Sequence, residues 1–487
     1  MSNRTEEQEI IIDALARVEN SIGVKAFAGT GKSYLLKEAT LEYPKWNFLG
    51  LAFNSSIVAE NSLKFPKKNT IWSTVHGLAR TFFQNSNFDI GKIKDEYYNI
   101  DIIDILKIKN DDYVLSSLIL EVFDLYCNSD LQDITVDGIS KTAYHQNKLN
   151  VTFASTELLE IACAKAKELW NLFLNKRIKM THSFYLKLFE TKRLATTIKN
   201  FDYVLLDEAQ DTNPVTMSIL NQINSRKIYV GDPHQSIYAF RGVINAINHA
   251  EEHHYLSSTF RYQTHIANQA SDLLFKYKNE KKRITSMAST SKEDKSKAII
   301  FRNNSSMIEA IDECITNGIK YKTLKNPEEL FKLAIVILEF KLTKKYPTDR
   351  NFAYFKKFRN YEELKQYIKD SQENELQTAN KMQERYGKGL YRYLIDAKKK
   401  FKEPYDGHIF LCTGHLSKGL EWGEVDIFHD FPNIEKKMIK NDIVNATDLL
   451  FKADEGNIIA NEIIQEINLR YVAITRAKHT LNFLEKK

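Results

Sequence analysis

Ala26-Phe-Ala-Gly-Thr-Gly-Lys-Ser33 is the stretch that decides the fold of this 487-residue chain. It follows the apolar run Gly23-Val-Lys-Ala-Phe27 and precedes Tyr34-Leu-Leu-Lys-Glu-Ala39, which has helical character. A glycine-rich turn between a strand and a helix lets backbone N–H groups surround phosphate oxygens, and the helix N-terminus adds a favourable dipole. The strict motif begins with glycine, whereas Ala26 stands here, at the position least close to the phosphates. We therefore predict a phosphate-binding loop.

Each residue of this loop has an expected task. Lys32 supplies a positive charge for the phosphates, and Ser33 supplies a hydroxyl for Mg²⁺. The glycines allow the backbone to approach the ligand closely, because they carry no side chain. The loop residues predicted to bind the phosphates of such a ligand are Ala28, Gly29, Thr30, Gly31, Lys32 and Ser33.

A second motif, Tyr203-Val-Leu-Leu-Asp-Glu-Ala-Gln-Asp211, is an apolar strand that ends in two adjacent carboxylates. Asp207 is placed to bind the water shell of the metal ion, and Glu208 to polarise an attacking water molecule. The alternative is a pair of acids that only caps the next helix. Together with a phosphate loop, the pair predicts hydrolysis of a nucleoside triphosphate with Mg²⁺ as cofactor.

Composition limits the class of protein. The chain is 43% hydrophobic and 27% charged, which is typical of a globular chain of two to four domains and excludes a peptide hormone or disulfide miniprotein. No apolar run approaches the roughly 20 residues of a membrane span, and Met1–Ile10 lacks an apolar signal core. The four cysteines form no CxxC pattern, so we expect neither a disulfide framework nor a compact zinc site. A cytoplasmic, reducing location is expected.

Short β-branched or apolar runs that end in functional loops alternate with helical stretches, which indicates parallel sheets covered by helices on both faces. The predicted strands are Ile22–Phe27, Tyr203–Leu206, Lys227–Val230, Ala298–Phe301, His408–Leu411 and Val425–Phe428. The predicted helices include Ser33–Thr40, Pro214–Ile223 and Thr264–Tyr277. Two helix-rich regions break the alternation and are interpreted as insertions. The fold class is therefore α/β.

Charge is concentrated in one part of the chain. Residues 341–402 hold 17 basic and 8 acidic residues, a net charge of +9 in a chain whose total is +6. A solvated helical face would explain such a charge run. Aromatic residues are interleaved with the charge in Phe352-Ala-Tyr-Phe-Lys-Lys-Phe-Arg-Asn-Tyr361, which favours a surface that faces a polyanion. As a hypothesis, Lys356, Lys357 and Arg359 hold duplex DNA.

Three further motifs occur in a fixed order along the chain. They are Val230-Gly-Asp-Pro-His-Gln-Ser-Ile-Tyr-Ala-Phe-Arg-Gly242, Ile409-Phe-Leu-Cys-Thr-Gly-His-Leu-Ser-Lys-Gly-Leu-Glu-Trp422 and Tyr471-Val-Ala-Ile-Thr-Arg-Ala-Lys478. With the two motifs above, they resemble the superfamily 1A helicases of the UvrD/Rep type. Phe53-Asn-Ser-Ser56, Phe65-Pro66 and Thr74-Val-His-Gly-Leu-Ala79 are most similar in wording to the F-box DNA helicase branch and its bacterial relatives. We expect no F-box region ahead of the motor.

The resemblance implies a domain organisation with two RecA-like P-loop cores, each interrupted by a mainly helical insertion. The expected parts are core 1A at 1–90, insertion 1B at 91–189, core 1A continued at 190–263, core 2A at 264–320, a reduced basic insertion 2B at 321–400, and core 2A continued at 401–487. ATP would bind between the cores and draw them together. That cycle would be the stroke of a motor.

The resemblance also implies roles for single residues. Gln8 would recognise the adenine, Glu421 would lie near the ribose, and Gln235 would sense the γ-phosphate. Arg261 and Arg476 would contact the γ-phosphate, and such arginines are worth about 10³–10⁵ in rate. Surface arginines in ordinary ion pairs are the alternative for these two residues.

A sequence-independent grip on single-stranded DNA requires aromatic side chains that stack on bases and polar groups that contact phosphates. The expected stacking residues are Phe53, Tyr238 and Phe240, with Trp422 in support. The expected polar contacts are Asn54, His76, Arg241, Thr413 and His415. Where the family often has lysine, this chain has Ser55 and Ser56, so it lacks that phosphate contact.

Three functions are compatible with these motifs. The first is an ATP-dependent helicase that moves 3′ to 5′ on single-stranded DNA as a monomer and acts at junctions of single-stranded and duplex DNA. The second is a translocase that strips proteins from DNA in recombination control. The third is a DNA-sensing ATPase subunit of a defence complex. The preference for DNA over RNA, like the polarity, is implied by the resemblance alone.

Overall fold

The computed structural model describes residues 4–52, 54–86, 90, 93–109, 112–146, 149–152, 154–238, 242–289, 294–348, 350–371, 374–404 and 406–485. The chain divides into two compact units. Unit 1 comprises residues 1–97, 118–289 and 434–471, and unit 2 comprises residues 98–117, 290–433 and 472–487. Helices α6 (Tyr113–Asn128) and α21 (Ile458–Ile474) each cross from one unit to the other.

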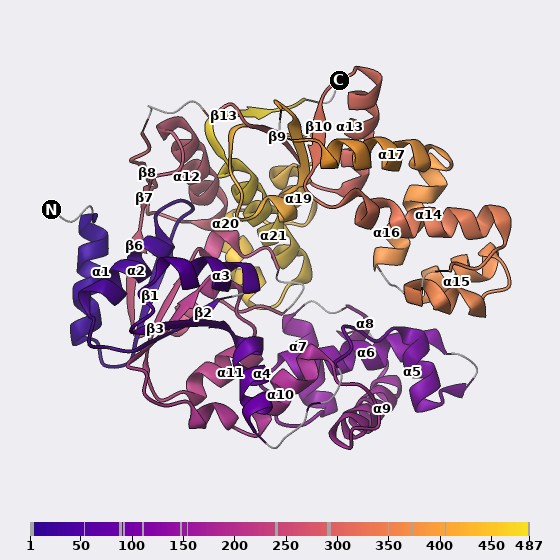
Figure 1. The fold of residues 1–487 in the computed structure, drawn as a ribbon, viewed down its shortest axis with the longest axis horizontal. Coiled ribbons are helices and arrows are strands. Elements are labelled where there is room, and N and C mark those ends of the chain that lie inside the picture. The colour runs from indigo at the N-terminus through magenta and orange to yellow at the C-terminus, as the bar shows by residue number, and fades with distance from the viewer. Residues whose placement is uncertain are drawn as a thin grey trace. The chain divides into compact units, whose positions relative to one another are not determined.

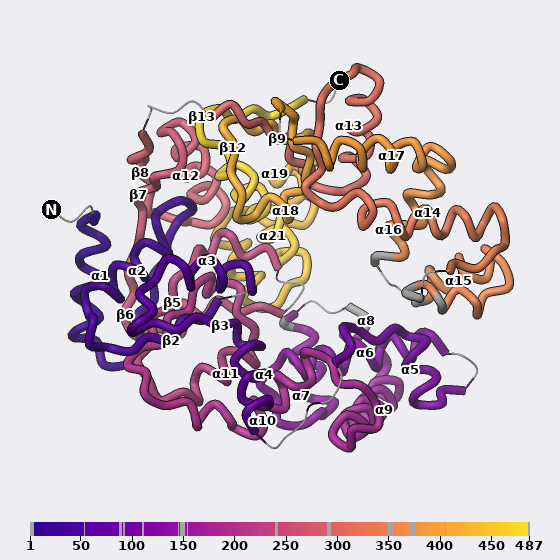
Figure 2. The backbone as a smooth tube through the Cα atoms, in the orientation of Figure 1, coloured from indigo at the N-terminus to yellow at the C-terminus, as the bar shows by residue number. Residues whose placement is uncertain are grey.

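Unit 1 is built on a six-stranded sheet in the order β3-β2-β4-β5-β1-β6, and all its paired strands are parallel. The strands are β1 (Ser21–Ala26), β2 (Phe48–Ala52), β3 (Thr70–Thr74), β4 (Tyr203–Asp207), β5 (Arg226–Gly231) and β6 (Glu252–Leu256). In Figure 2 the indigo strands β2 and β3 and the magenta β5 belong to this sheet, with β4 between β2 and β5, so segments far apart in sequence share one sheet. The three strands predicted in this part of the chain are confirmed.

Burial explains why these segments are strands. Every residue of β2 and β4 is buried, as expected for central strands of a parallel sheet with helices on both faces. Gly50 in β2 is required by a close approach, because a Cβ atom there would lie 2.3 Å from the indole ring of Trp72. The carboxyl ends of β1, β4 and β5 lead into the predicted phosphate loop, the paired carboxylates and the third motif.

Helices cover this sheet and form the insertion of unit 1 (Figure 1). Those encoded near the core strands are α1 (Glu6–Arg17), α2 (Lys32–Glu42), α3 (Ser55–Lys64), α4 (Val75–Asn85), α11 (Pro214–Gln222) and α12 (Thr264–Lys278). Those of the insertion, after α6, are α7 (Val136–His145), α8 (Leu149–Thr152), α9 (Thr156–Leu174) and α10 (His182–Thr191). The C-terminal segment of the unit adds α19 (Ile434–Lys440), α20 (Ala446–Asp454) and most of α21.

Short elements complete unit 1. They are the 3-10 helices η2 (Leu194–Thr197), η3 (Ala209–Asp211), η4 (Pro233–Gln235) and η6 (Ala246–His249), and the paired strands β7 (Ser258–Thr259) and β8 (Thr285–Ser286). Within helix α10, Lys187 Nζ and Glu190 Oε2 form a buried ion pair at 2.8 Å. Ser218 of α11 donates to the same carboxylate at 2.7 Å. The insertion is therefore fixed to the helix that follows the paired carboxylates.

Unit 2 contains a five-stranded parallel sheet in the order β10-β11-β9-β12-β13. The strands are β9 (Lys297–Phe301), β10 (Tyr321–Thr323), β11 (Ile409–Thr413), β12 (Trp422–Ile427) and β13 (Ala477–Phe483). The three strands predicted here are confirmed. Strand β10 continues the sheet into residues predicted as the start of insertion 2B.

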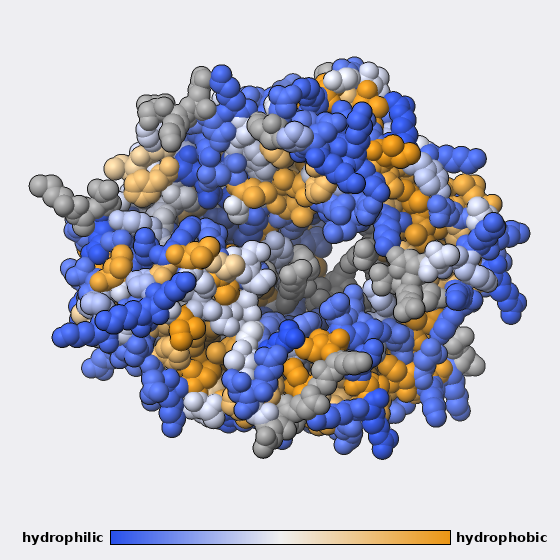
Figure 3. All heavy atoms as spheres, viewed as in Figure 1, coloured by the Kyte–Doolittle hydropathy of each residue, from blue (hydrophilic) through white to orange (hydrophobic). Residues whose placement is uncertain are grey.

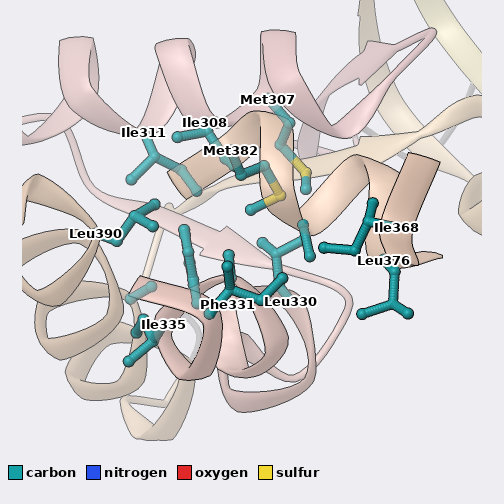
Figure 4. Packing of buried hydrophobic residues seen from close by; sticks show 14 of the residues in the cluster. Met307, Ile308, Ile311, Leu330, Phe331, Ile335, Ile368, Leu376, Met382 and Leu390 are labelled. Atoms are coloured by element: carbon teal, nitrogen blue, oxygen red, sulfur yellow. The ribbon is translucent and has the colours of Figure 1, made fainter. Parts of the chain in front are cut away.

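Helices complete unit 2 around a hydrophobic core. They are α5 (Asn99–Leu106), α13 (Asn304–Thr316), α14 (Pro327–Thr343), η7 (Arg350–Lys357), α15 (Tyr361–Ser371), α16 (Asn374–Tyr386), α17 (Gly389–Lys402) and α18 (Gly414–Ser417). The part of the core drawn in Figure 4 includes Met307, Ile308, Ile311, Leu330, Phe331, Ile335, Met382 and Leu390. Side chains of α13, α14, α16 and α17 therefore close one core over the sheet.

Helix α5 belongs to unit 2 although its residues were predicted in insertion 1B. Lys357 of η7 donates to Asp104 of α5 at 3.0 Å, and the ring of Tyr98 stacks near that of Tyr354. Residues 434–471 lie with unit 1 although they were predicted in core 2A. The predicted domain boundaries rest on the family pattern, whereas the two compact units are defined by which residues pack together. The domain boundaries therefore stay a prediction.

The fold class is confirmed as α/β: the described residues form two large parallel sheets, a small two-stranded parallel sheet and many helices. On the face shown in Figure 3, hydrophilic residues cover most of the surface and apolar residues form smaller areas between them. Among the residues that the structure describes, no helix is both long and apolar enough to span a membrane.

Candidate nucleotide site

The phosphate loop joins β1 to α2 in unit 1. Gly29 and Gly31 adopt φ angles of 75° and 84°, in the left-handed region that favours glycine. A Cβ atom on Gly29 would lie 2.6 Å from both the Cβ of Arg261 and the Oγ1 of Thr259. Gly31 stands at the N-cap of α2 and contributes no side-chain hydrogen bond there. The amides at the start of α2 thus form the type of helix terminus that binds anions.

Lys32 and Glu208 meet at this loop. The Lys32 Nζ donates to the Glu208 Oε1 at 2.8 Å, and both side chains are largely buried. Burial would lower the pKa of Lys32, but the carboxylates of Glu208, Asp207 and Asp232 outweigh it and raise this pKa. Glu208 has φ 54° and ψ 42°, a left-handed conformation that costs a non-glycine residue roughly 1–3 kcal/mol. The structure therefore holds a strained carboxylate against the cation of the phosphate loop.

Asp207 ends strand β4 and is 4% exposed. Burial and then the neighbouring Glu208 carboxylate raise the pKa of Asp207 to about 6, although Lys32 acts in the opposite direction. A buried carboxylate beside a second carboxylate is stabilised by a bound cation, because the cation offsets both effects. The pair therefore fits a Mg²⁺ ion, for which Ser33 is the predicted hydroxyl ligand.

Gln8 lies in the first turn of α1 and is 1% exposed. Its Oε1 accepts a hydrogen bond from the Thr5 amide at 3.0 Å, which completes a capping box. Its Nε2 is buried and makes no hydrogen bond within the described part of the chain. A buried donor without a partner is costly, so Gln8 fits a nucleobase that offers an acceptor.

Asp232, at the N-cap of η4, connects three motifs through hydrogen bonds. Its Oδ2 accepts from Gln235 Nε2 at 2.7 Å and from the Tyr471 hydroxyl at 3.0 Å. The Tyr471 oxygen in turn accepts from the Ala28 amide of the phosphate loop at 3.1 Å. The Asp232 amide donates to Gln210 Oε1 at 2.9 Å.

Gln210 carries this network on to Glu208, since its Nε2 donates to the Glu208 Oε2 at 2.6 Å. Gly231 makes room for Gln210, because a Cβ at Gly231 would lie 2.2 Å from the Gln210 Oε1. Sequence reasoning missed Gln210, Asp232 and Tyr471 as parts of the site. Each of the three lies within a motif that the sequence had indicated as functional. Membership of a motif was therefore the sequence signal that could have identified them.

Arg261 lies beside the phosphate loop in unit 1. Its amide donates to Thr259 Oγ1 at 3.3 Å, and that hydroxyl donates to the Ala28 carbonyl at 3.0 Å. The Phe260 amide donates to the Gly29 carbonyl at 2.9 Å. The segment after β7 that carries Arg261 is therefore hydrogen-bonded to the loop on which phosphates are predicted to bind.

Arg476 and Glu421 lie together in unit 2. Arg476 is 1% exposed, and its Nε and Nη1 donate to the carbonyls of Val472 and Leu420, both at 3.0 Å. Glu421 pairs with Lys478 at 3.0 Å. The structure thus brings Gln8, the phosphate loop, Asp207, Glu208, Gln235 and Arg261 into unit 1, and Arg476 and Glu421 into unit 2.

Three of the predicted DNA contacts, Phe53, Phe240 and Arg241, lie outside the described residues. Asn54 caps α3 by accepting from the Ile57 amide at 2.9 Å, and Thr413 caps α18 by accepting from the Leu416 amide at 3.4 Å. These caps position the loops that carry the motifs.

The other predicted DNA contacts are distributed over both units. His76 is the second residue of α4 and Tyr238 follows η4, both in unit 1. His415 is in α18, and Trp422 begins β12, where it is 4% exposed with its ring centroid 6.1 Å from that of Phe410. A contribution of Trp422 to DNA binding would therefore be indirect.

A cavity of about 500 Å³ lies at the carboxyl end of the sheet in unit 1. His76, Asp207 and Glu208 line it together with Asp124 and Asn128 of α6. A residue predicted to contact DNA and the two carboxylates predicted to act on ATP therefore share one cavity wall.

The fold and this site define a P-loop protein of the α/β class. Residues 5–256, more than half of the chain, match the family model of the UvrD/REP helicase N-terminal domain. The chain therefore belongs to the UvrD/REP helicase family, and the resemblance noted from its motifs is confirmed.

Two relatives are similar to this protein along nearly the whole chain, and a third along about half of it. F-box DNA helicase protein 1 of Schizosaccharomyces pombe is 27% identical over 98% of this chain and 57% of its own length. F-box DNA helicase 1 of Gallus gallus is 24% identical over 98% of this chain and 48% of its own length. ATP-dependent DNA helicase Rep of Buchnera aphidicola is 24% identical over 47% of this chain and 37% of its own length. The chain thus spans about half the length of the F-box helicases that it matches.

Proposed function

We propose that this protein is an ATP-dependent DNA helicase that moves 3′ to 5′ on single-stranded DNA and couples ATP hydrolysis to strand separation. The observation that supports the proposal is the contact of Lys32 Nζ with Glu208 Oε1 at 2.8 Å, because these are the residues to which we assign phosphate binding and activation of water. The names of the relatives support DNA as the substrate.

In this proposal each part of the site in unit 1 has one task. Lys32 and the amides of the loop bind the phosphates, while Gln8 binds the adenine through its Nε2. Glu208 accepts a proton from the attacking water. The strained φ of Glu208 and its hydrogen bond from Gln210 fix the direction in which the carboxylate points.

Ser33 and Asp207 would hold Mg²⁺, which neutralises charge on the phosphate oxygens when it is bound. Arg261 and Arg476 would neutralise the transferring phosphoryl group. Removal of Mg²⁺ by a chelator should therefore abolish turnover.

The single-stranded DNA would lie on the surface formed by the motif loops. His76 supports this assignment because it lines the same cavity as Glu208, so a displacement of His76 by DNA would reach the hydrolytic carboxylate directly. Action at junctions of single-stranded and duplex DNA, a monomeric motor and a cytoplasmic location belong to the same proposal.

The test is the ATPase rate of the purified chain without nucleic acid and with poly-dT, poly-U or blunt duplex DNA. We expect poly-dT to raise kcat at least about tenfold. A rate that no polymer changes would contradict the proposal and favour an ATPase that responds to a protein partner. Equal stimulation by poly-U would contradict the preference for DNA.

A further inference from the structure

Tyr471 is buried where three motifs of unit 1 meet. Its side chain is 0% exposed, and its hydroxyl accepts from the Ala28 amide at 3.1 Å and donates to Asp232 Oδ2 at 3.0 Å. His234 packs against it with a ring-centroid distance of 5.8 Å and an interplanar angle of 71°. One hydroxyl group therefore bonds the phosphate loop to the loop that carries Gln235.

Asp232 Oδ2 accepts two hydrogen bonds, one from Tyr471 and one from Gln235 Nε2 at 2.7 Å. The Gln235 amide nitrogen carries two N–H groups, so one can stay on Asp232 while the other is directed at a phosphate oxygen. Asp232 is 0% exposed, and a buried carboxylate that loses its donors carries a large desolvation cost. The Tyr471 hydroxyl and the His234 amide, which donates to Asp232 Oδ1 at 3.0 Å, therefore hold in place the carboxylate that orients Gln235.

The Tyr471 hydroxyl also provides a hydrogen-bond partner for the phosphate loop. Ala28 is 1% exposed, and its amide would have no partner if the Tyr471 oxygen were absent. Burial and then the Asp232 charge raise the pKa of Tyr471, so the phenol stays protonated and can serve as a donor. The network also reaches Glu208 through Gln210, since the Asp232 amide bonds to Gln210.

We propose that Tyr471 is a positioning residue for ATP hydrolysis: its hydroxyl holds the phosphate loop and the Asp232 carboxylate in register, so that Asp232 directs the Gln235 amide at the γ-phosphate. This inference rests on the proposed function, because it concerns the same reaction. Tyr471 acts through Asp232 and Gln235 and itself contacts neither substrate nor metal.

The test is Tyr471→Phe in the full chain, which removes the hydroxyl and keeps the ring. We expect kcat of the ATPase with poly-dT to fall about tenfold or more while KM for ATP changes less than about threefold. The matched control is Tyr203→Phe, which also loses a buried hydroxyl, one that donates to the Leu15 carbonyl at 2.6 Å outside the network. A purely structural role would lower the melting temperature in both variants and leave kcat similar in both.

A double-mutant cycle with Gln235→Ala separates the mechanism from general damage. If Tyr471 acts through Gln235, the double variant is no slower than Gln235→Ala alone. A kcat of Tyr471→Phe within about twofold of the wild type, or losses that multiply in the double variant, would overturn the inference.

Failure of the proposed function and failure of the inference about Tyr471 give different results. If DNA does not stimulate the ATPase activity of the wild type, the proposed function is wrong. If DNA stimulates the wild type and Tyr471→Phe has the same kcat, only the inference about Tyr471 is wrong. If Tyr471→Phe does not fold, Asp232→Asn replaces it, since it keeps the shape of the side chain and weakens the same hydrogen bonds. The same loss in kcat at constant KM is expected, and an unchanged kcat would again overturn the inference.

Discussion

At the scale of single residues, Lys32 and Glu208 form an ion pair whose two members have different expected tasks. The ammonium of Lys32 is to bind phosphate, and the carboxylate of Glu208 is to accept a proton from water. In the structure they bond to each other at 2.8 Å. Binding of ATP must therefore separate them, after which Gln210 is left to hold Glu208 through its bond of 2.6 Å.

The two roles predict different defects. Lys32→Ala should weaken ATP binding and abolish turnover, because the positive charge is lost. Glu208→Gln should retain ATP and Mg²⁺ but hydrolyse about 100-fold more slowly or worse, since an amide cannot accept the proton. Titration with a fluorescent ATP analogue and steady-state rates measure the two effects. An equal loss of ATP affinity in both variants would count against the assignment.

Asp207 predicts a pH-dependent effect on stability. Its pKa rises from 3.8 to about 6 on folding, so the folded state binds the proton more tightly and stability falls as the pH rises from about 4 to 6. Above pH 6 the buried charge costs on the order of 2–3 kcal/mol in the absence of metal. Asp207→Asn should therefore melt at a higher temperature than the wild type at pH 7.5, with a smaller difference at pH 4.5.

Calorimetry without nucleotide or Mg²⁺ measures this difference. The control is Asp426→Asn, which removes another buried carboxylate, one that is paired with Lys297 at 2.9 Å. That change should lower the melting temperature because it breaks an ion pair. A less stable Asp207→Asn variant at pH 7.5 would contradict the assigned cost.

At the scale of elements, the site is made by loops that follow the carboxyl ends of parallel strands. The phosphate loop follows β1, Glu208 follows β4 and Asp232 follows β5, and β1 and β4 both pair with β5. Loops at the carboxyl ends of neighbouring parallel strands meet at one edge of a sheet, where such folds bind their ligands. The hydrogen bonds of Asp232 with Tyr471, Gln235 and Gln210 connect the loops at that edge.

The basic segment at residues 341–402 of unit 2 leads us to expect that duplex DNA binding depends on salt concentration. Lys357 shares its charge with Asp104 at 3.0 Å, and the side chains of Lys357 and Arg359 are 39% and 89% exposed. Each phosphate contact contributes about 0.9 to the slope of log affinity against log salt. Replacement of Lys356, Lys357 and Arg359 by glutamine should therefore make that slope shallower by roughly 2.

Fluorescence anisotropy of a labelled duplex between 50 and 200 mM salt, a range of about fourfold, measures the slope. The control variant neutralises Lys436, Lys437 and Lys440 of α19 in unit 1, which changes the net charge equally. An unchanged slope would discard the hypothesis, as would an equal change in the control.

At the scale of the whole molecule, local sequence patterns predicted the strands well. Apolar runs such as Tyr203–Leu206 are buried on both faces in a parallel sheet, and that environment determines their composition. The tight turn between β1 and α2 was equally predictable, because Gly29 and Gly31 adopt the positive φ angles that favour glycine. Apolar strands and glycine turns depend on residues that are close in sequence, so they can be predicted without knowledge of the fold.

The hydrogen bonds of the site could not be predicted in the same way. Ala28 and Tyr471 are 443 residues apart, and nothing in either local pattern specifies that a hydroxyl meets that amide. The same holds for residues 434–471, whose packing with unit 1 depends on the tertiary contacts of α12 with α20. Motifs thus indicate which residues matter, and the fold determines which of them touch.

The most direct test of the central claim, that ATP hydrolysis drives strand separation, is displacement of a labelled strand from duplexes with a 3′ or a 5′ single-stranded tail. We predict displacement that requires ATP and Mg²⁺, occurs on the 3′-tailed duplex and is absent with the Glu208→Gln variant. Failure to displace a strand from either substrate, in a preparation that hydrolyses ATP when DNA is added, would contradict the claim.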